Sequence, residues 1–157
     1  MKMILEHLGI NPERFQVKWI SAAESILFVQ AITAFDNQIR DIGLLKQTEN
    51  LNLKTLQHKL RAARMAVEGK MFRMVFAKQA KQMKGNNSYG EFPSKDKLME
   101  TFANEMALNE TLLFLEEKEQ RYATEISELL KVPVEQVMSY VETLQKRNLW
   151  KGELHEV

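Results

Sequence analysis

The spacing of apolar residues changes along the chain, and each spacing predicts an element. Residues 2–8 have a helical pattern, and Phe15, Val17 and Trp19 then alternate with polar residues, which is the period of a half-buried strand. Residues 21–43 return to helical spacing and end on a glycine. The apolar face of that helix consists of Phe28, Ile32, Phe35, Ile39 and Ile42. The first part of the chain therefore predicts a helix–strand–helix fragment.

A second helical stripe covers residues 54–84 and predicts one long helix. Gly69 lies inside it, and glycine costs about 1 kcal/mol against alanine within a helix, so a bend or a break at this position stays open. Residues 85–94, "GNNSYGEFPS", are rich in turn-forming residues and predict a linker.

The last part of the chain predicts a winged helix-turn-helix. Its spacing indicates a long helix at 95–118, a short helix at 125–130, a tight break before Pro133 and a second helix at 134–147. Residues 149–154 are suited to a small hairpin. Together these elements predict a mainly α fold in three parts. The parts are a helix–strand–helix segment at 1–49, a long basic helix with its linker at 50–91, and a winged-helix domain at 92–157.

Charge is nearly balanced over the chain, with 22 basic and 21 acidic residues, but it is concentrated in one segment. Residues 54–91 carry nine bases and two acids, a net charge of +7. A helix with this charge can contact phosphates, an acidic lipid surface or an acidic protein face. The alternative is a solvated face that offsets the acidic ends of the chain. Arg61, Arg64 and Arg73 are the candidate protein-binding residues of this helix.

No set of side chains has the spacing of a catalytic or metal site. His7, His58 and His155 lie far apart, and no glycine-rich phosphate loop follows a strand. The chain has no cysteine, which excludes disulfides, thiolate metal sites and cysteine-ligated iron–sulfur clusters within it. We therefore expect no catalytic, cofactor-binding or metal-binding residues, and no activity of the chain alone.

The predicted winged helix is poorly suited to reading DNA. The outward residues of its second helix include Glu135 and Glu142, and residues 116–157 have a net charge of −3. Acids close to phosphates oppose the counterion release on which DNA affinity depends. A DNA partner is therefore disfavoured, and a role as a packing module fits better.

Three short motifs in the first part of the chain carry a family resemblance. They are "GINPER" at 9–14, "WISAAE" at 19–24 and "IRDIG" at 39–43. In this order, residues 1–43 resemble the C-terminal end of the methyl-viologen-reducing hydrogenase delta subunit family. The resemblance implies electron transfer between a hydrogenase or formate dehydrogenase and a heterodisulfide-reductase-type complex, through a 2Fe–2S cluster. The cysteines of that cluster lie upstream of the matched part in the family, so none of its ligands can be assigned to this chain.

The function that we expect is a non-catalytic accessory or docking subunit of a heterodisulfide-reductase/hydrogenase-type electron-transfer complex. Its partners would be redox subunits that carry iron–sulfur clusters and flavin, and it would act by protein contact. Phe15, Val17 and Trp19 are the candidate contact residues, and without a partner their apolar surface could be covered by self-association. The alternatives are a winged-helix nucleic-acid-binding regulator and an independent redox enzyme. No apolar run reaches the roughly 18 residues of a membrane span, so a cytoplasmic location is expected.

Overall fold

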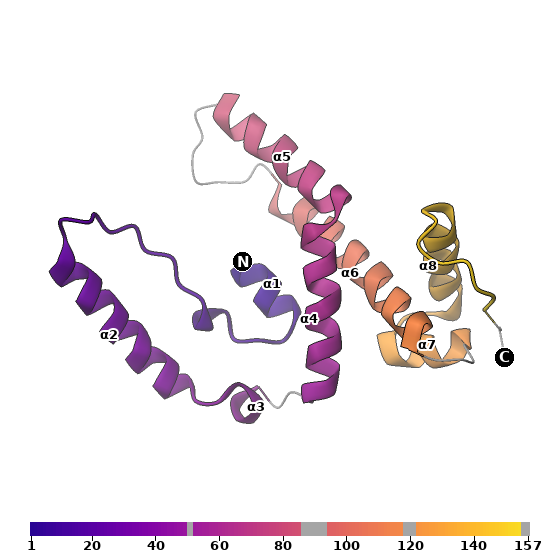
Figure 1. Cartoon of the computed structure of the whole chain (residues 1–157), viewed down its shortest axis with the longest axis horizontal. Helices are drawn as coiled ribbons and strands as arrows, with labels where there is room; N and C mark the ends of the chain where they lie inside the picture. The colour runs from indigo at the N-terminus through magenta and orange to yellow at the C-terminus, as the bar shows by residue number, and fades with distance from the viewer. Residues whose placement is uncertain (50–51, 86–93, 118–121, 155–157) are drawn as a thin grey trace. The chain divides into compact units, whose positions relative to one another are not determined.

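The computed structural model describes residues 1–49, 52–85, 94–117 and 122–154. Within these ranges every regular element is a helix, drawn in Figure 1 as coiled ribbons joined by irregular segments. The chain divides into two compact units, Met1–Gln57 (unit 1) and His58–Val157 (unit 2).

Unit 1 is built from short helices, one longer helix and extended chain. Its elements are α1 (Lys2–His7), the 3-10 helix η1 (Pro12–Arg14), α2 (Ser25–Ile42), α3 (Leu45–Thr48) and the start of α4 (Leu53–Glu68). Gly9 has a φ of 74°, a left-handed conformation that glycine adopts without steric cost, and it lets the Ile10 N–H donate to the Leu5 carbonyl at 2.8 Å. The chain can therefore turn sharply out of α1 into η1.

A bidentate ion pair fixes η1 against the end of α3. Arg14 donates through Nε to Glu49 Oε1 at 2.7 Å and through Nη2 to Oε2 at 3.0 Å. Both side chains are nearly buried, and the Asn11 N–H also donates to Glu49 Oε1 at 3.2 Å. The arginine holds the pKa of the Glu49 carboxyl below its ordinary value. This pair joins two segments that are 35 residues apart in the sequence.

The strand predicted around Phe15, Val17 and Trp19 is wrong. The backbone at Phe15 is extended, but none of the described residues pairs with this segment through a β ladder. An extended chain becomes a strand only when a neighbouring strand supplies the hydrogen bonds. Val17 and Trp19 are instead 62% and 96% exposed. The helix–strand–helix fragment is therefore a helix, an extended segment and a helix.

The start of α2 has one half of a capping box. The Glu24 carboxylate accepts a hydrogen bond from the Ser21 N–H at 2.9 Å, as a capping box requires. The Ser21 hydroxyl, however, accepts from the Ala23 N–H at 3.4 Å, and the helix begins at Ser25. Gly43, with a φ of 80°, follows the last helical residue as predicted.

The long basic helix predicted over 54–84 is two helices. Gly69 separates α4 from α5 (Lys70–Gly85). A Cβ atom at Gly69 would lie 3.1 Å from the carbonyl oxygens of Met65 and Ala66, which is a tight approach for any side chain. A glycine here therefore allows the helical path to change direction.

Unit 2 has its own core, centred on α6 (Lys95–Glu117), α7 (Ala123–Leu130) and α8 (Val134–Lys146), which also lie together in Figure 1. Helix α6 is covered on several sides, because it packs against α5, α7 and α8. Phe72 of α5 meets Phe102 edge to face, with ring centroids 6.0 Å apart. The core side chains near α7 and α8 are Leu108, Leu112, Leu115, Ala123, Ile126, Val137, Val141, Leu144 and Trp150.

The turn between α7 and α8 passes through one left-handed residue before Pro133. Lys131 adopts a left-handed φ of 56°, and the Ser127 hydroxyl donates to the Val132 carbonyl at 2.6 Å. Pro133 then starts α8, where its missing N–H costs no hydrogen bond. Asn148, which follows the C-cap Arg147, has a left-handed φ of 56°.

The predicted winged helix, however, is wrong, because the hairpin expected at 149–154 is absent from the described chain. Tyr122 makes one isolated β-type bridge, which no described residue extends into a strand. Trp150 inserts into the core and is 8% exposed, and Gln145 Nε2 of α8 donates to the Gly152 carbonyl at 3.4 Å. The segment is held by side chains of unit 2 and forms no ladder.

A second bidentate ion pair ties α6 to the end of α8. Arg147 donates through Nη1 and Nη2 to the two carboxylate oxygens of Glu105, both at 2.9 Å. The Glu105 side chain is 11% exposed and the Arg147 side chain 35% exposed. The paired carboxylate raises the pKa of Arg147, so the charge of the guanidinium is secure. This contact fixes the position of α8 along α6.

Removing one member of this pair should destabilise unit 2 strongly. We expect Glu105→Ala to lower the free energy of unfolding by about 2–3 kcal/mol, because it leaves a partly buried guanidinium without its partner. Glu142→Ala breaks the exposed i,i+4 pair with Lys146 and should cost less than about 0.5 kcal/mol. Urea unfolding followed by circular dichroism measures both. Equal losses in the two variants would contradict the role given to the buried pair.

Candidate functional site

The most unusual surface of unit 1 is helix α2, which has no buried residue along its length. No charged residue occurs between Ser25 and Phe35, and apolar side chains point to most sides of this half of the helix. Five of them are between 50% and 72% exposed: Ile26, Leu27, Phe28, Val29 and Ile32. We call these five residues the α2 face. A helix that is apolar on all sides is normally enclosed by other elements.

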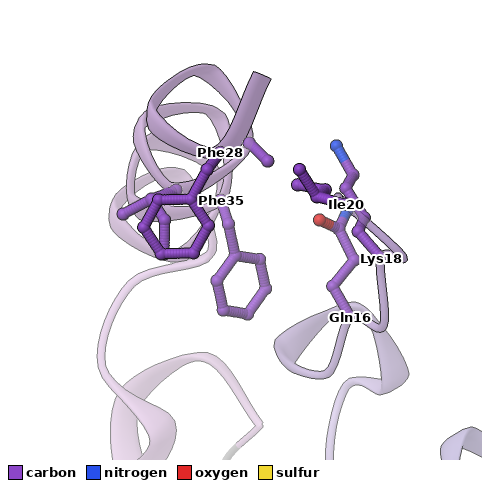
Figure 2. A pocket seen from close by; sticks show the side chains of 7 residues that line it. Gln16, Lys18, Ile20, Phe28 and Phe35 are labelled. Carbon is purple, nitrogen blue, oxygen red and sulfur yellow. The ribbon is translucent and has the colours of Figure 1, made fainter. Parts of the chain in front are cut away.

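A shallow pocket of about 290 Å³ lies between α2 and the extended segment that precedes it. Figure 2 shows Phe28 and Phe35 of α2 on one side, with Gln16, Lys18 and Ile20 across from them. Gln38 holds the two sides together through Nε2, which donates to the Glu13 carbonyl at 2.9 Å. The wall combines five apolar side chains with two polar ones, the amide of Gln16 and the ammonium of Lys18.

The side chains of this surface are suited to packing against another molecule. Lys18 is the one ionisable group among the lining residues, and it has no carboxylate or imidazole beside it in the pocket. General acid–base or nucleophilic catalysis needs a second polar group within hydrogen-bond reach of the first. A contiguous exposed apolar patch marks an interaction site in a soluble protein. The α2 face with its pocket is therefore a candidate docking surface.

The predicted contact residues of this unit lie beside the pocket but do not line it. Gln16, Lys18 and Ile20 line it, so alternation places Val17 and Trp19 on the opposite side of the extended segment. Phe15 is half-buried. The α2 face itself was missed, because the apolar positions of that helix were described only as a stripe and no contact residue was named among them. The uncharged stretch from Ser25 to Phe35 was the signal that could have revealed it.

The structure does not gather the three predicted arginines into one site. Arg61 and Arg64 lie on α4, where Arg61 Nη1 is 3.7 Å from Glu117 and Arg64 Nε donates to Glu68 at 2.9 Å. Arg73 lies on α5, beyond the break at Gly69, and is exposed. Two of the three charges are therefore already engaged within the chain.

Among the described residues, no three His, Cys, Asp or Glu side chains lie close enough to hold a metal ion. His58 packs its ring against Phe114, with centroids 4.0 Å apart, and neither ring nitrogen makes a hydrogen bond. Its Nε2 is 3.9 Å from Glu117, which is near enough for attraction but too far for a hydrogen bond. Desolvation lowers the pKa of His58, although Glu117 opposes this shift. Of the described helices, none is long and apolar enough to cross a bilayer.

Comparison with known proteins finds a family match for residues 1–43, the segment that contains the α2 face. The profile of the family described as "Methyl-viologen-reducing hydrogenase, delta subunit" matches residues 1–43. Residues 1–43 are similar to a delta-subunit segment. Over the same length the chain is 44% identical to a protein of Archaeoglobus profundus that is named as an iron–sulfur subunit of the F420-non-reducing hydrogenase. The resemblance read from the sequence is thus confirmed for this part.

The match is partial for both proteins. It covers 27% of this chain and 31% of the Archaeoglobus protein, so the chain spans about a third of the length of that relative. No solved structure matches the chain. The relative is named an iron–sulfur subunit. The 157 residues of this chain contain no cysteine, so the residues of this chain do not fit a cysteine-ligated cluster.

The fluorescence of the two tryptophans should show that one is exposed in unit 1 and the other is buried in unit 2. Trp19 is 96% exposed and Trp150 is 8% exposed. We expect Trp150→Phe, which leaves Trp19, to give red-shifted emission that acrylamide quenches strongly, whereas Trp19→Phe should give blue-shifted, protected emission. A dilution series tests self-association at the same time. Protection of Trp19 at the lowest concentration would contradict its exposure in the monomer.

The buried His58 should make stability depend on pH. Because its pKa is lowered on folding, the unfolded chain takes up the proton first. Well above pH 6.5, the ordinary pKa of histidine, protonation of His58 does not affect the free energy of unfolding. As the pH falls from there to the folded pKa, it lowers the free energy of unfolding progressively. As the pH falls through this window, we expect the wild type to lose stability relative to the His58→Phe variant, measured as the difference in their free energies of unfolding. A difference that is constant with pH would contradict the desolvated imidazole.

Proposed function

We propose that this chain is a non-catalytic accessory subunit that docks on the redox subunits of a hydrogenase- or heterodisulfide-reductase-type electron-transfer complex. The observation that carries the proposal is the exposed α2 face within the very segment that matches the delta-subunit family. In the Archaeoglobus relative, the matching segment belongs to a protein named as an iron–sulfur subunit. Its partner would therefore be a protein of that redox class.

Burial supplies the affinity in this proposal. Removing one Leu, Ile, Val or Phe side chain from water contributes about 1.5–3 kcal/mol. The five side chains of the α2 face exceed what one flat contact can cover, since they point to several sides of the helix. A partner that encloses the N-terminal half of α2 fits this arrangement. Asp36 and Arg40, an i,i+4 ion pair 2.8 Å apart, keep the C-terminal half polar.

Electron transfer itself would lie with the partner. The chain offers no cysteine ligand, and its described residues contain no metal-binding cluster. Iron–sulfur clusters and flavin are therefore assigned to the partner in this proposal. The accessory chain would contribute position, by holding subunits together through contact.

Co-expression with hydrogenase- and heterodisulfide-reductase-type subunits tests the proposal. Affinity capture through this chain should retain a coloured complex with measurable iron and flavin. Ile32→Glu places a charge in the centre of the α2 face and should reduce capture at least about 10-fold, because burying an unpaired carboxylate is costly. Leu129→Glu is the matched control, since Leu129 is 56% exposed but lies on α7 of unit 2.

Three results would contradict the proposal: capture without iron, equal capture by the two variants, or retention of nucleic acid in place of a redox protein.

A further inference from the structure

Unit 2 carries a second exposed surface, which differs in chemistry from the α2 face. Helix α5 has five basic residues and no acidic one. All five are exposed, and none makes an ion pair with a described residue: Lys70, Arg73, Lys78, Lys81 and Lys84. We call them the α5 basic face. The opposite side of α5 is fixed to the core through the half-buried Phe72 and the buried Gln79, whose Nε2 donates to the Ser94 carbonyl at 2.8 Å.

A pocket of about 430 Å³ opens at the N-terminal end of this face, where Gly69 interrupts the helical path. Its size is within the roughly 300–1,000 Å³ of pockets that enclose organic groups. The apolar wall comes from α4, α5, α6, α8 and the segment after α8, through Met65, Met71, Leu108, Leu144 and Leu149. We call it the kink pocket. Lys70 belongs both to the kink pocket and to the α5 basic face.

The remaining charges of the kink pocket are already balanced. Glu105 and Arg147 line it, but they neutralise each other through two hydrogen bonds of 2.9 Å. The uncompensated charge at the pocket is therefore the ammonium of Lys70. An apolar cavity beside a row of cations has the layout of a protein interface, in which an apolar anchor is surrounded by a charged rim.

We propose that the kink pocket and the α5 basic face together bind an acidic protein segment that carries one large apolar anchor residue. The anchor would enter the pocket between Met65 and Met71, and carboxylates on either side would meet Lys70 and the cations further along α5. Methionine side chains adapt their shape to such an anchor. A phosphate polymer or a lipid headgroup would use the cations but has no group for the apolar wall. This surface lies wholly in unit 2 and stands independently of the redox assignment.

Two short fluorescent peptides test the proposal on the full chain by anisotropy. One is polyglutamate with a central tryptophan, and the other has serine in place of the tryptophan. We expect the tryptophan peptide to bind about 10-fold more tightly, since a buried anchor residue carries much of the binding energy of such an interface. A DNA duplex and phosphatidylserine vesicles serve as competing probes.

Matched variants locate the binding. Met71→Trp narrows the pocket and should abolish the preference for the tryptophan peptide. Met74→Trp, at a position 53% exposed on the same helix but outside the pocket lining, should keep it. Lys70→Glu should weaken both peptides about 3- to 10-fold, whereas Lys54→Glu, on an exposed position of α4, should have little effect.

Methyl NMR of the unmodified chain gives a reading that needs no variant, because the resonances of Leu108 and Leu144 should shift with the tryptophan peptide alone. Three outcomes would overturn the proposal. These are equal affinity for the two peptides, a preference that survives Met71→Trp in a folded variant, or tighter binding of the duplex or the vesicles than of the tryptophan peptide.

Discussion

Helix α2 needs apolar cover that unit 1 does not supply, and this constraint governs how the whole N-terminal part can work. The free energy of burying an apolar side chain is gained only where another surface replaces water. Full burial of such a side chain contributes about 1.5–3 kcal/mol, and each residue of the α2 face is 50–72% exposed, so roughly half or more of that free energy is ungained at each position. The sum over the five positions is comparable with the roughly 5–15 kcal/mol that stabilises an ordinary domain. Unit 1 is joined internally by the Arg14–Glu49 pair and by the buried side chains of Leu8, Ile10 and Leu56, and the α2 face remains exposed.

Unit 2 covers its apolar side chains with its own helices. Phe102, Leu115, Val137 and Leu144 are all less than 2% exposed, and they come from α6 and α8, which the Glu105–Arg147 pair holds in register. A unit with such a core can keep its shape while its surface is used for recognition. The family match stops at residue 43, so it falls entirely within unit 1. The segment that resembles a redox subunit thus lies in unit 1, where the described buried apolar side chains are Leu8, Ile10 and Leu56, whereas the larger described core lies in unit 2.

Local sequence signals predicted the parts of the fold that depend on local interactions. The end of α2 at Gly43 was predicted because a positive φ is a property of glycine itself. The strand at 15–19 was predicted from alternation and the hairpin at 149–154 from the order of the elements before it, and both are wrong, since a ladder depends on a second chain segment that neither signal specifies. The extended segment keeps the alternation, with Gln16, Lys18 and Ile20 on the side of α2 and Trp19 away from it.

The candidate site was harder to predict than the helices for a related reason. A stripe of Phe28, Ile32 and Phe35 has the same spacing whether it faces a core or a partner, so spacing identifies an apolar face but not what covers it. The arginines of the basic segment were ambiguous in the same way, and the pairs Arg61–Glu117 and Arg64–Glu68 show that part of that charge is used within the chain.

The α2 face and the α5 basic face differ in the force that would hold a partner. Contacts through the α2 face depend on apolar burial, which salt does not screen, whereas contacts through α5 depend on exposed charges whose attraction falls off within about 8 Å at physiological ionic strength. The two proposed contacts should therefore respond differently to salt, because one depends on apolar burial and the other on exposed charge.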